Sequence, residues 1–337
     1  MRWTLLPATS FRLHAARWDA LRASGPAAPV LDSRFLAALL DAFGGGAELL
    51  ALCEDDAGPV AAALLAPQGK GRWATFQPAQ APVGPWIQRP GLDTDALLAG
   101  LVRALPGCAL LAGLTQCDPF LLPRPGGAGA DYIDTARITI DRAFDAWWES
   151  RGKNLRANLR KQRNRLAAAG TATRLEVWRD AGHMAQAVAD YGRLESTGWK
   201  GRAGTAVGAG NDQERFYRAM LEAFCAEGRG SVVRYFFGAE LVAMDLCIEE
   251  GDCIVILKTA YDERVPAQYS PALLMREEAC RGLFEAGGIR RIEFYGKVME
   301  WHTRWTDEIR TMYHLNHYRW PVLARLQAWR RRGGTNS

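Results

Sequence analysis

Hydrophobic and polar positions switch between a helical and a strand-like period along the chain, and these switches outline the expected elements. Residues 33–43 show a helical apolar pattern, with Ser33 as the expected cap and Gly44 as the stop. Residues 47–77 contain short apolar runs separated by Asp, Gly and Pro, which predict three short strands. A second helix over 93–107 and an apolar strand over 108–116 follow.

The same order of elements is predicted again further along. Residues 144–169 have the helical period, and Ser270 and Pro271 begin a strongly signalled helix that Gly287 and Gly288 end. The other elements expected here are strands over 174–180, 231–238, 240–250, 252–262 and 289–296 and helices over 181–198 and 210–228. The two halves therefore share an order of helix, hairpin strands, helix and strand, although their sequences are not alike.

Length and composition agree with a two-domain globular protein. The chain has 337 residues, of which 48% are hydrophobic and 23% charged. We expect one lobe over 1–135, a second over 136–325, and a basic, flexible tail over 326–337. The net charge of +5 permits an anionic ligand such as a nucleotide-bearing cofactor without requiring nucleic acid.

The seven cysteines form no CxxC pair and no Cys/His ligand spacing, so we expect reduced thiols, no metal and a cytoplasmic protein. Cys247 and Cys253 flank a predicted turn, and a disulfide across that hairpin is the alternative. The chain has no run of about 18 apolar residues, and its first apolar run is too short for a signal peptide. A membrane span is therefore not expected.

Several stretches of the second half together resemble a known group of enzymes. They are the basic helix NLRANLRKQRNRLAAAG, the GWKG of residues 198–201, the strand AELVAMDLCI, the AYD of residues 260–262, the helix start YSPALLM, and the closing FYG and WHTRWT. Because of these stretches, residues 130–320 resemble the GNAT acyltransferase superfamily. They resemble in particular the double-GNAT, CelD-like acetyltransferases linked to cellulose biosynthesis. That group is related to the Fem-type peptidyltransferases, which use aminoacyl-tRNA.

The resemblance implies an α/β (α+β) fold of two tandem GNAT-like lobes, each a mixed, mostly antiparallel sheet flanked by helices. It also implies acetyl-CoA or a longer acyl-CoA as the donor, with its phosphates at the start of the helix that follows Ser270. The cofactor-binding residues would be Gln268, Tyr269, Ser270, Ala272 and Leu273. The chain departs from the family here, because its loop lacks the usual glycines and Pro271 removes a backbone donor.

Four residues are candidates for catalysis. In the closing motif His302 stands where the family usually has a lysine, and a group that titrates near neutrality suits a general base for an attacking amine. Asp245 lies among apolar neighbours, so we expect it to be paired or functional. Glu293 is expected to share its cleft or to pair with Arg290 or Arg291, and Asp262 to be catalytic or a turn residue.

Positive and aromatic side chains suggest where a substrate binds. The helix near residue 155 carries a row of basic residues beside a stripe of leucines and no acidic residue, which predicts either an anion site or a solvated face. After the strand that ends at Gly296, a loop is expected to place cations over the end of the sheet. The substrate-binding candidates are Arg156, Arg160, Arg163, Trp199, Lys200, Lys297 and Arg304.

Three functions remain open from the sequence. The first is an N-acyltransferase that moves an acyl group from acyl-CoA to an amine of a small molecule or peptide. The second is a Fem-like transferase that draws on aminoacyl-tRNA, although no long helical hairpin for tRNA is seen. The third is a non-enzymatic module whose basic helix binds a polyanion.

Overall fold

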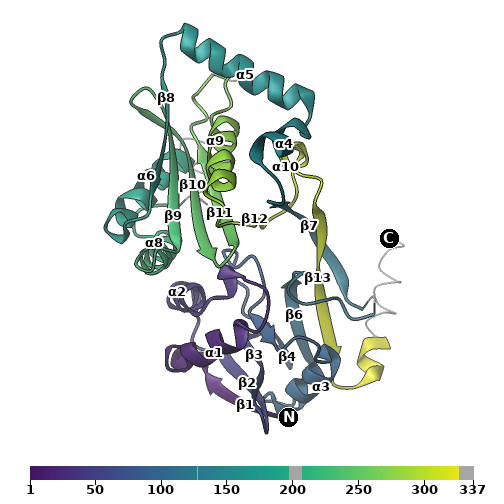
Figure 1. Cartoon of the computed structure of the whole chain (residues 1–337). Helices are drawn as coiled ribbons and strands as arrows, with labels where there is room; N and C mark the ends of the chain where they lie inside the picture. The colour runs from purple at the N-terminus through teal and green to yellow at the C-terminus, as the bar shows by residue number, and fades with distance from the viewer. Residues whose placement is uncertain (127, 197–206, 267, 326–337) are drawn as a thin grey trace, which may run out of the picture. The chain divides into compact units, whose positions relative to one another are not determined.

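The computed structural model describes residues 1–126, 128–196, 207–266 and 268–325, and the chain divides into two compact units. The first unit comprises residues 1–26, 30–133 and 311 onward, and the second comprises residues 27–29 and 134–310. Each unit is a mixed, mostly antiparallel sheet with helices on its faces (Figure 1), which confirms the predicted fold class.

The sheet of the first unit has the strand order β1-β2-β3-β4-β6-β13, with β5 paired to β3. Within this sheet β4 and β6 alone pair in parallel, and the other strand pairs are antiparallel. Its elements are β1 (Arg2–Pro7), α1 (Ala15–Arg22), α2 (Ser33–Phe43), β2 (Leu49–Asp55), β3 (Gly58–Pro67), β4 (Arg72–Thr75), β5 (Trp86–Gln88), α3 (Thr94–Ala104), β6 (Leu111–Cys117) and most of β13 (Ile309–Tyr318).

Two expectations for this unit need correction. Asp32, not Ser33, caps α2, because its side chain accepts the backbone N–H of Arg34. Residues 311–325 were expected in the second lobe, yet they belong to the first unit, because β13 pairs antiparallel with β6 from Tyr313↔Cys117 to Tyr318↔Leu111.

The second unit has the strand order β7-β12-β11-β10-β9-β8, and within it β11 and β12 alone pair in parallel. Its helices are α4 (Phe144–Glu149), α5 (Lys153–Ala168), α6 (Met184–Ser196), α8 (Asp212–Cys225), α9 (Pro271–Ala286) and α10 (Glu300–Trp305). Its strands are β7 (Ala130–Thr139, which enters the unit at Asp134), β8 (Thr173–Trp178), β9 (Gly230–Phe237), β10 (Glu240–Glu250), β11 (Cys253–Tyr261) and β12 (Arg291–Phe294).

Helices cover both faces of this second sheet. Strand β9 is buried along nearly its whole length, as expected when α9 lies on one face and α6 and α8 lie on the other (Figure 1). Helix α5 lies at the outer edge of the unit and buries Leu155, Leu159 and Leu166 in the same apolar cluster as the core residues of α9. The leucine stripe predicted from the sequence is therefore the packing face of α5.

Two further expectations for this unit differ from the structure. The helical pattern over 144–169 is two helices, α4 and α5, separated at Ser150–Gly152. The segment after Gly296 was expected to be a loop, yet it folds into the short helix α10, with Trp305 fully buried beside Trp147 and Trp148.

All seven cysteines are free, so Cys247 and Cys253 form no disulfide. Within the described ranges, no helix is long and apolar enough to cross a membrane. The expected tail over 326–337 lies outside the described residues.

Candidate functional site

A cleft lies between the two parallel strands of the second unit. Strands β11 and β12 pair only from Cys253↔Arg291 to Val255↔Glu293, after which β11 continues for six more residues. The edge of β11 is therefore open beyond Val255, and a cavity of about 1030 Å³ lies there. The cavity is lined by β11, the start of α9, the end of β12 and α10.

The start of α9 forms one side of this cavity. Tyr269, Ser270, Ala272 and Leu273 line it, whereas Gln268 is exposed and does not. Most backbone donors here are already occupied. The N–H of Ser270 donates to Oε1 of Gln162 at 2.9 Å, and the N–H of Leu273 donates to the Ser270 carbonyl at 3.0 Å.

The N–H of Ala272 has no acceptor among the residues that the structure describes. Helix α9 thus offers an anion its positive end and this one free amide, fewer donors than a glycine-rich phosphate loop would supply.

His302 lies on α10 against the cavity and is only 7% exposed. Its Nδ1 accepts the backbone N–H of Met299 at 2.9 Å, and its ring stacks on Trp301 with centroids 3.6 Å apart. Burial, the larger cause, and the charge of Arg276 lower the pKa of His302 to about 4. The general-base role expected for His302 does not fit this geometry, because near neutral pH its free nitrogen, Nε2, carries a proton.

Asp245 is buried beneath the cavity, where it pairs with Arg276 of α9. Its Oδ1 accepts hydrogen bonds from Arg276 Nη2 at 3.0 Å and from Thr259 Oγ1 at 2.6 Å, and its Oδ2 lies 2.7 Å from Arg276 Nη1. Burial raises the pKa of Asp245, and Arg276 and Thr259 oppose that shift. The carboxylate does not line the cavity, so the paired reading of Asp245 fits the structure and the catalytic one does not.

Glu293 has a similar environment on β12. It is 1% exposed, and its carboxylate lies 2.8 Å from Arg310 Nη2 and 3.4 Å from Arg291 Nη1. It is absent from the cavity lining, so a shared cleft with Asp245 is not formed. The expected alternative, a pair with Arg291, is what the structure shows.

Asp262 follows β11 and does line the cavity. Its carboxylate accepts the backbone N–H of Arg264 at 2.9 Å and also pairs with the Arg264 guanidinium. This is the geometry of a turn residue. Of the four catalytic candidates, Asp262 and His302 lie at the cavity. A catalytic role for Asp262 remains a prediction, whereas the general-base role predicted for His302 does not fit the geometry.

The cations expected to bind substrate are dispersed over the second unit. Arg163 pairs with Glu277 and Glu278, and Arg156 donates to the Arg151 carbonyl. Lys297 is exposed and lines the cavity, whereas Arg304 pairs with Glu300 beside a separate cavity of about 670 Å³. Trp199 and Lys200 lie outside the described residues.

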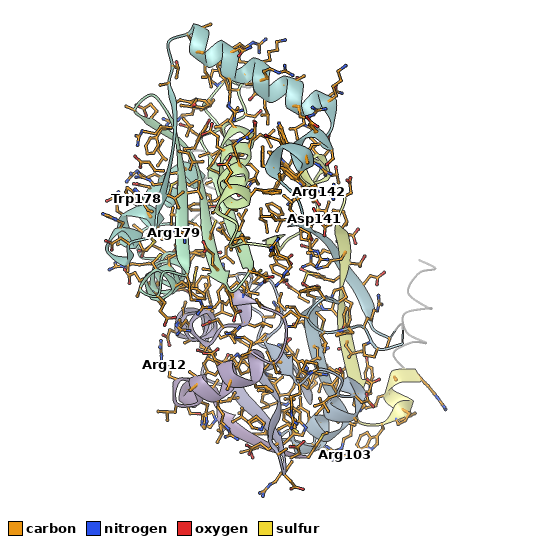
Figure 2. The ribbon with its side chains drawn as sticks, viewed as in Figure 1. Arg12, Arg103, Asp141, Arg142, Trp178 and Arg179 are labelled. Carbon is orange, nitrogen blue, oxygen red and sulfur yellow. The ribbon has the colours of Figure 1, made fainter. Side chains whose placement is uncertain are left out.

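Helix α5 presents a second set of cations on its solvent side. Lys153, Arg160, Lys161 and Arg165 are exposed, and none makes an ion pair within the part of the chain that the structure describes. Figure 2 shows nitrogen-tipped side chains projecting from the outer surface of this helix. Arg156, Arg160 and Arg163 line one cavity of about 470 Å³, together with the carboxylates of Asp145, Glu149 and Glu277. Arg163 is paired with Glu277, and an anion site on this row remains a prediction.

Sequence reasoning missed three charged residues that line the cavity, which are Lys258, Glu263 and Arg276. Lys258 Nζ lies 3.2 Å from the buried Glu195 Oε1 and 5.3 Å from the ring centroid of Tyr217. Lys258 stands alone in the apolar strand CIVILKTAY, so the signal that singled out Asp245 was present there too. Arg276 carried no such signal, because a charged residue in a long helix is usually on its solvent face.

No group of three His, Cys, Asp or Glu side chains that could hold a metal ion occurs among the described residues.

The fold is shared with solved structures over nearly the whole chain. The chain superposes on FemX with a TM-score of 0.59 at 10% identity, covering 96% of this chain and 98% of FemX. It superposes on the C-terminal domain of a protein described as a lysylphosphatidylglycerol synthetase from Agrobacterium fabrum with a TM-score of 0.56 at 14% identity, covering 91% of each chain. The chain also superposes on a conserved protein of unknown function from Bacteroides thetaiotaomicron VPI-5482. The TM-score is 0.54 at 11% identity, and the superposition covers 90% of this chain and 96% of that one.

The fold and the cleft thus define a mixed α/β protein with a ligand cavity at a pair of parallel strands. Residues 153–303, which contain β11, α9, β12 and His302, match the model of the acetyltransferase (GNAT) domain. The matched part, which is less than half of the chain, is similar to a GNAT acetyltransferase domain, and the protein is an acyltransferase. No curated protein sequence matches the chain. Assignment to the CelD-like group remains a prediction.

Proposed function

We propose that this protein transfers an acyl group from acyl-CoA to an amine of a small molecule or peptide. The observation that supports this most is the cleft between β11 and β12, within the matched domain and beside the positive end of α9. An extended donor can lie against the open edge of β11, where backbone groups beyond Val255 have no partner on β12. A cavity of about 1030 Å³ is at the upper end of the usual range for small-molecule sites.

Donor binding tests this proposal directly. Isothermal titration with CoA, acetyl-CoA and longer acyl-CoA should show micromolar to millimolar binding at one site. Ala272→Glu places a negative charge beside the free amide of α9, and we expect it to weaken binding at least about tenfold. The matched control is Ala226→Glu, at an exposed position at the end of α8. If no CoA species binds the wild type, the acyl-CoA proposal fails.

A second candidate is a Fem-like transfer from aminoacyl-tRNA, favoured by the exposed cations of α5. These four residues share their helix with Gln162, whose side chain contacts Ser270 at the cavity. Large apolar side chains are missing from the exposed positions between them, which are Asn154, Ala157, Asn158 and Asn164. That composition suits contact with phosphates better than insertion into a membrane.

Replacing Lys153, Arg160, Lys161 and Arg165 with Gln tests this candidate. If α5 contacts a phosphate backbone, the variant should bind a fluorescent tRNA acceptor-stem hairpin more weakly. The slope of log K against log salt concentration should also become shallower by about 3, as expected for four lost phosphate contacts. Thermal stability should hardly change, because exposed cations contribute little to folding.

The matched control removes four exposed cations of the first unit, Arg2, Lys70, Arg72 and Arg103. If both variants lost the same tRNA affinity, the attraction between the protein and tRNA would be nonspecific. Unaltered affinity in the α5 variant would identify a solvated face.

A further inference from the structure

The inner end of the cavity carries two buried groups with unused hydrogen-bond donors. The first is Arg276, which is 2% exposed and lines the cavity. Its Nη2 donates to Asp245 and Thr259, whereas its Nη1, which lies close to Asp245 Oδ2, has no hydrogen bond of acceptable geometry. Its Nε–H likewise has no acceptor among the described residues.

The second group is His302. Since Nδ1 accepts the N–H of Met299, the neutral ring carries its proton on Nε2, and Nε2 has no acceptor within the described ranges. Stacking on Trp301 and an edge contact with Phe294, at a centroid distance of 5.7 Å, hold the ring in place. The direction of this donor is therefore set before any substrate arrives.

Arg276 and His302 both pack against Phe294, at the point where β11 and β12 separate. Phe294 is the first residue of β12 beyond the last pair with β11. The Arg276 guanidinium carbon lies 5.3 Å from its ring centroid, and the His302 ring packs on its edge. Both residues line the cavity, and His302 Nε2–H and Arg276 Nε–H have no protein acceptor among the described residues, so a ligand there can accept from both.

The charges decide which oxygen these donors suit. Asp245 already balances Arg276, and His302 is neutral near pH 7, so the site holds little excess positive charge for a full carboxylate. A neutral carbonyl oxygen that becomes negative only during the reaction fits better, because preset donors then stabilise the transition state more than the ground state.

We propose that His302 Nε2–H and the Arg276 guanidinium bind the thioester carbonyl oxygen of the acyl donor and stabilise the oxyanion formed from it. This inference rests on the proposed acyl-CoA function. The amine nitrogen bonds to the carbonyl carbon, and the C=O electron pair moves onto the oxygen that the two donors hold. When the carbonyl re-forms, the C–S bond breaks, and the proton lost by the amine ends on the departing thiolate. His302 stays neutral throughout.

A pair of His302 variants separates this role from a structural one. In His302→Asn the amide oxygen can take the place of Nδ1 and cap Met299, but no donor reaches the position of Nε2. In His302→Gln the amide nitrogen can reach that position. We expect His302→Asn to lower kcat by about 10²–10³-fold with little change in the KM for acyl-CoA. We expect the kcat of His302→Gln to be much closer to that of the wild type.

Equal losses of kcat in the Asn and Gln variants, with matching drops in Tm, would overturn the proposal and leave a packing role. Full activity in the Asn variant would overturn it as well. Arg276→Lys, which keeps the charge but loses the Nε–H, should also lower kcat more than it changes KM.

Infrared spectroscopy of bound acetyl-CoA labelled with ¹³C at the carbonyl gives a readout that needs no turnover. Bound to the wild type, the thioester stretch should move to lower wavenumber, and in His302→Asn it should return toward the free value. If acetyl-CoA binds with an unshifted carbonyl, the oxyanion inference fails while the acyl-CoA proposal stands. If acetyl-CoA does not bind at all, the proposed function itself fails.

Discussion

Replacing Asp245 with Ala is expected to lower the free energy of unfolding by about 3–5 kcal/mol. The substitution leaves the Arg276 guanidinium buried without its carboxylate partner, and an uncompensated buried charge is strongly destabilising. Chemical denaturation, followed by tryptophan fluorescence and circular dichroism, measures the change. Asp245→Asn keeps the side-chain volume and an acceptor for Thr259. We therefore expect its free energy of unfolding to lie between those of the wild type and Asp245→Ala.

The control for this prediction is another Asp–Arg pair in the same unit. Asp141 and Arg142, labelled in Figure 2, are neighbours in sequence, pair at 2.7 Å and are both exposed. Asp141→Ala should therefore leave stability essentially unchanged, since solvent screens the pair. If both alanine variants unfolded at the same denaturant concentration, burial would not be what makes the Asp245 pair important.

Acid is expected to destabilise the protein through His302. Burial and the charge of Arg276 lower its pKa from 6.5 to about 4 in the folded state. Between these values the unfolded chain binds a proton that the folded chain does not, so stability falls as pH drops from 6.5 toward 4. A difference of 2.5 pKa units corresponds to about 3 kcal/mol.

The measurement is the free energy of unfolding from pH 4 to 7 in the wild type and in His302→Asn. The Asn variant retains the acceptor for Met299 but has no imidazole to titrate. Between pH 7 and pH 4 its free energy of unfolding should therefore fall by about 3 kcal/mol less than that of the wild type. His314 and His317, whose pKa values burial also lowers, contribute equally to both proteins. His183→Asn, at an exposed position, serves as the control. Parallel curves for the wild type and His302→Asn would show that His302 does not titrate in this range.

Local signals were enough to predict α9. Ser270 precedes it, Pro271 begins it, and Gly287 ends it with a φ of 73°, in the left-handed region that glycine adopts without strain. Each of these preferences acts within one turn of helix, so the sequence specifies them without knowledge of the rest of the fold. The separation of α4 from α5 and the pairing of β13 with β6 depend on contacts far along the chain, and both were missed.

The sequence by itself determined the class of fold, the helix at the cleft and the presence of His302 and Asp262 beside it. It also indicated that Asp245, alone among apolar neighbours, is either paired or functional. Only the tertiary structure showed that Arg276 is its partner, because the two are 31 positions apart and meet across β10 and α9. The tertiary structure likewise decided the protonation of His302. Its pKa depends on burial, on the charge of Arg276 and on the backbone of Met299, and the first two of these arise only when α9 and α10 pack around Phe294.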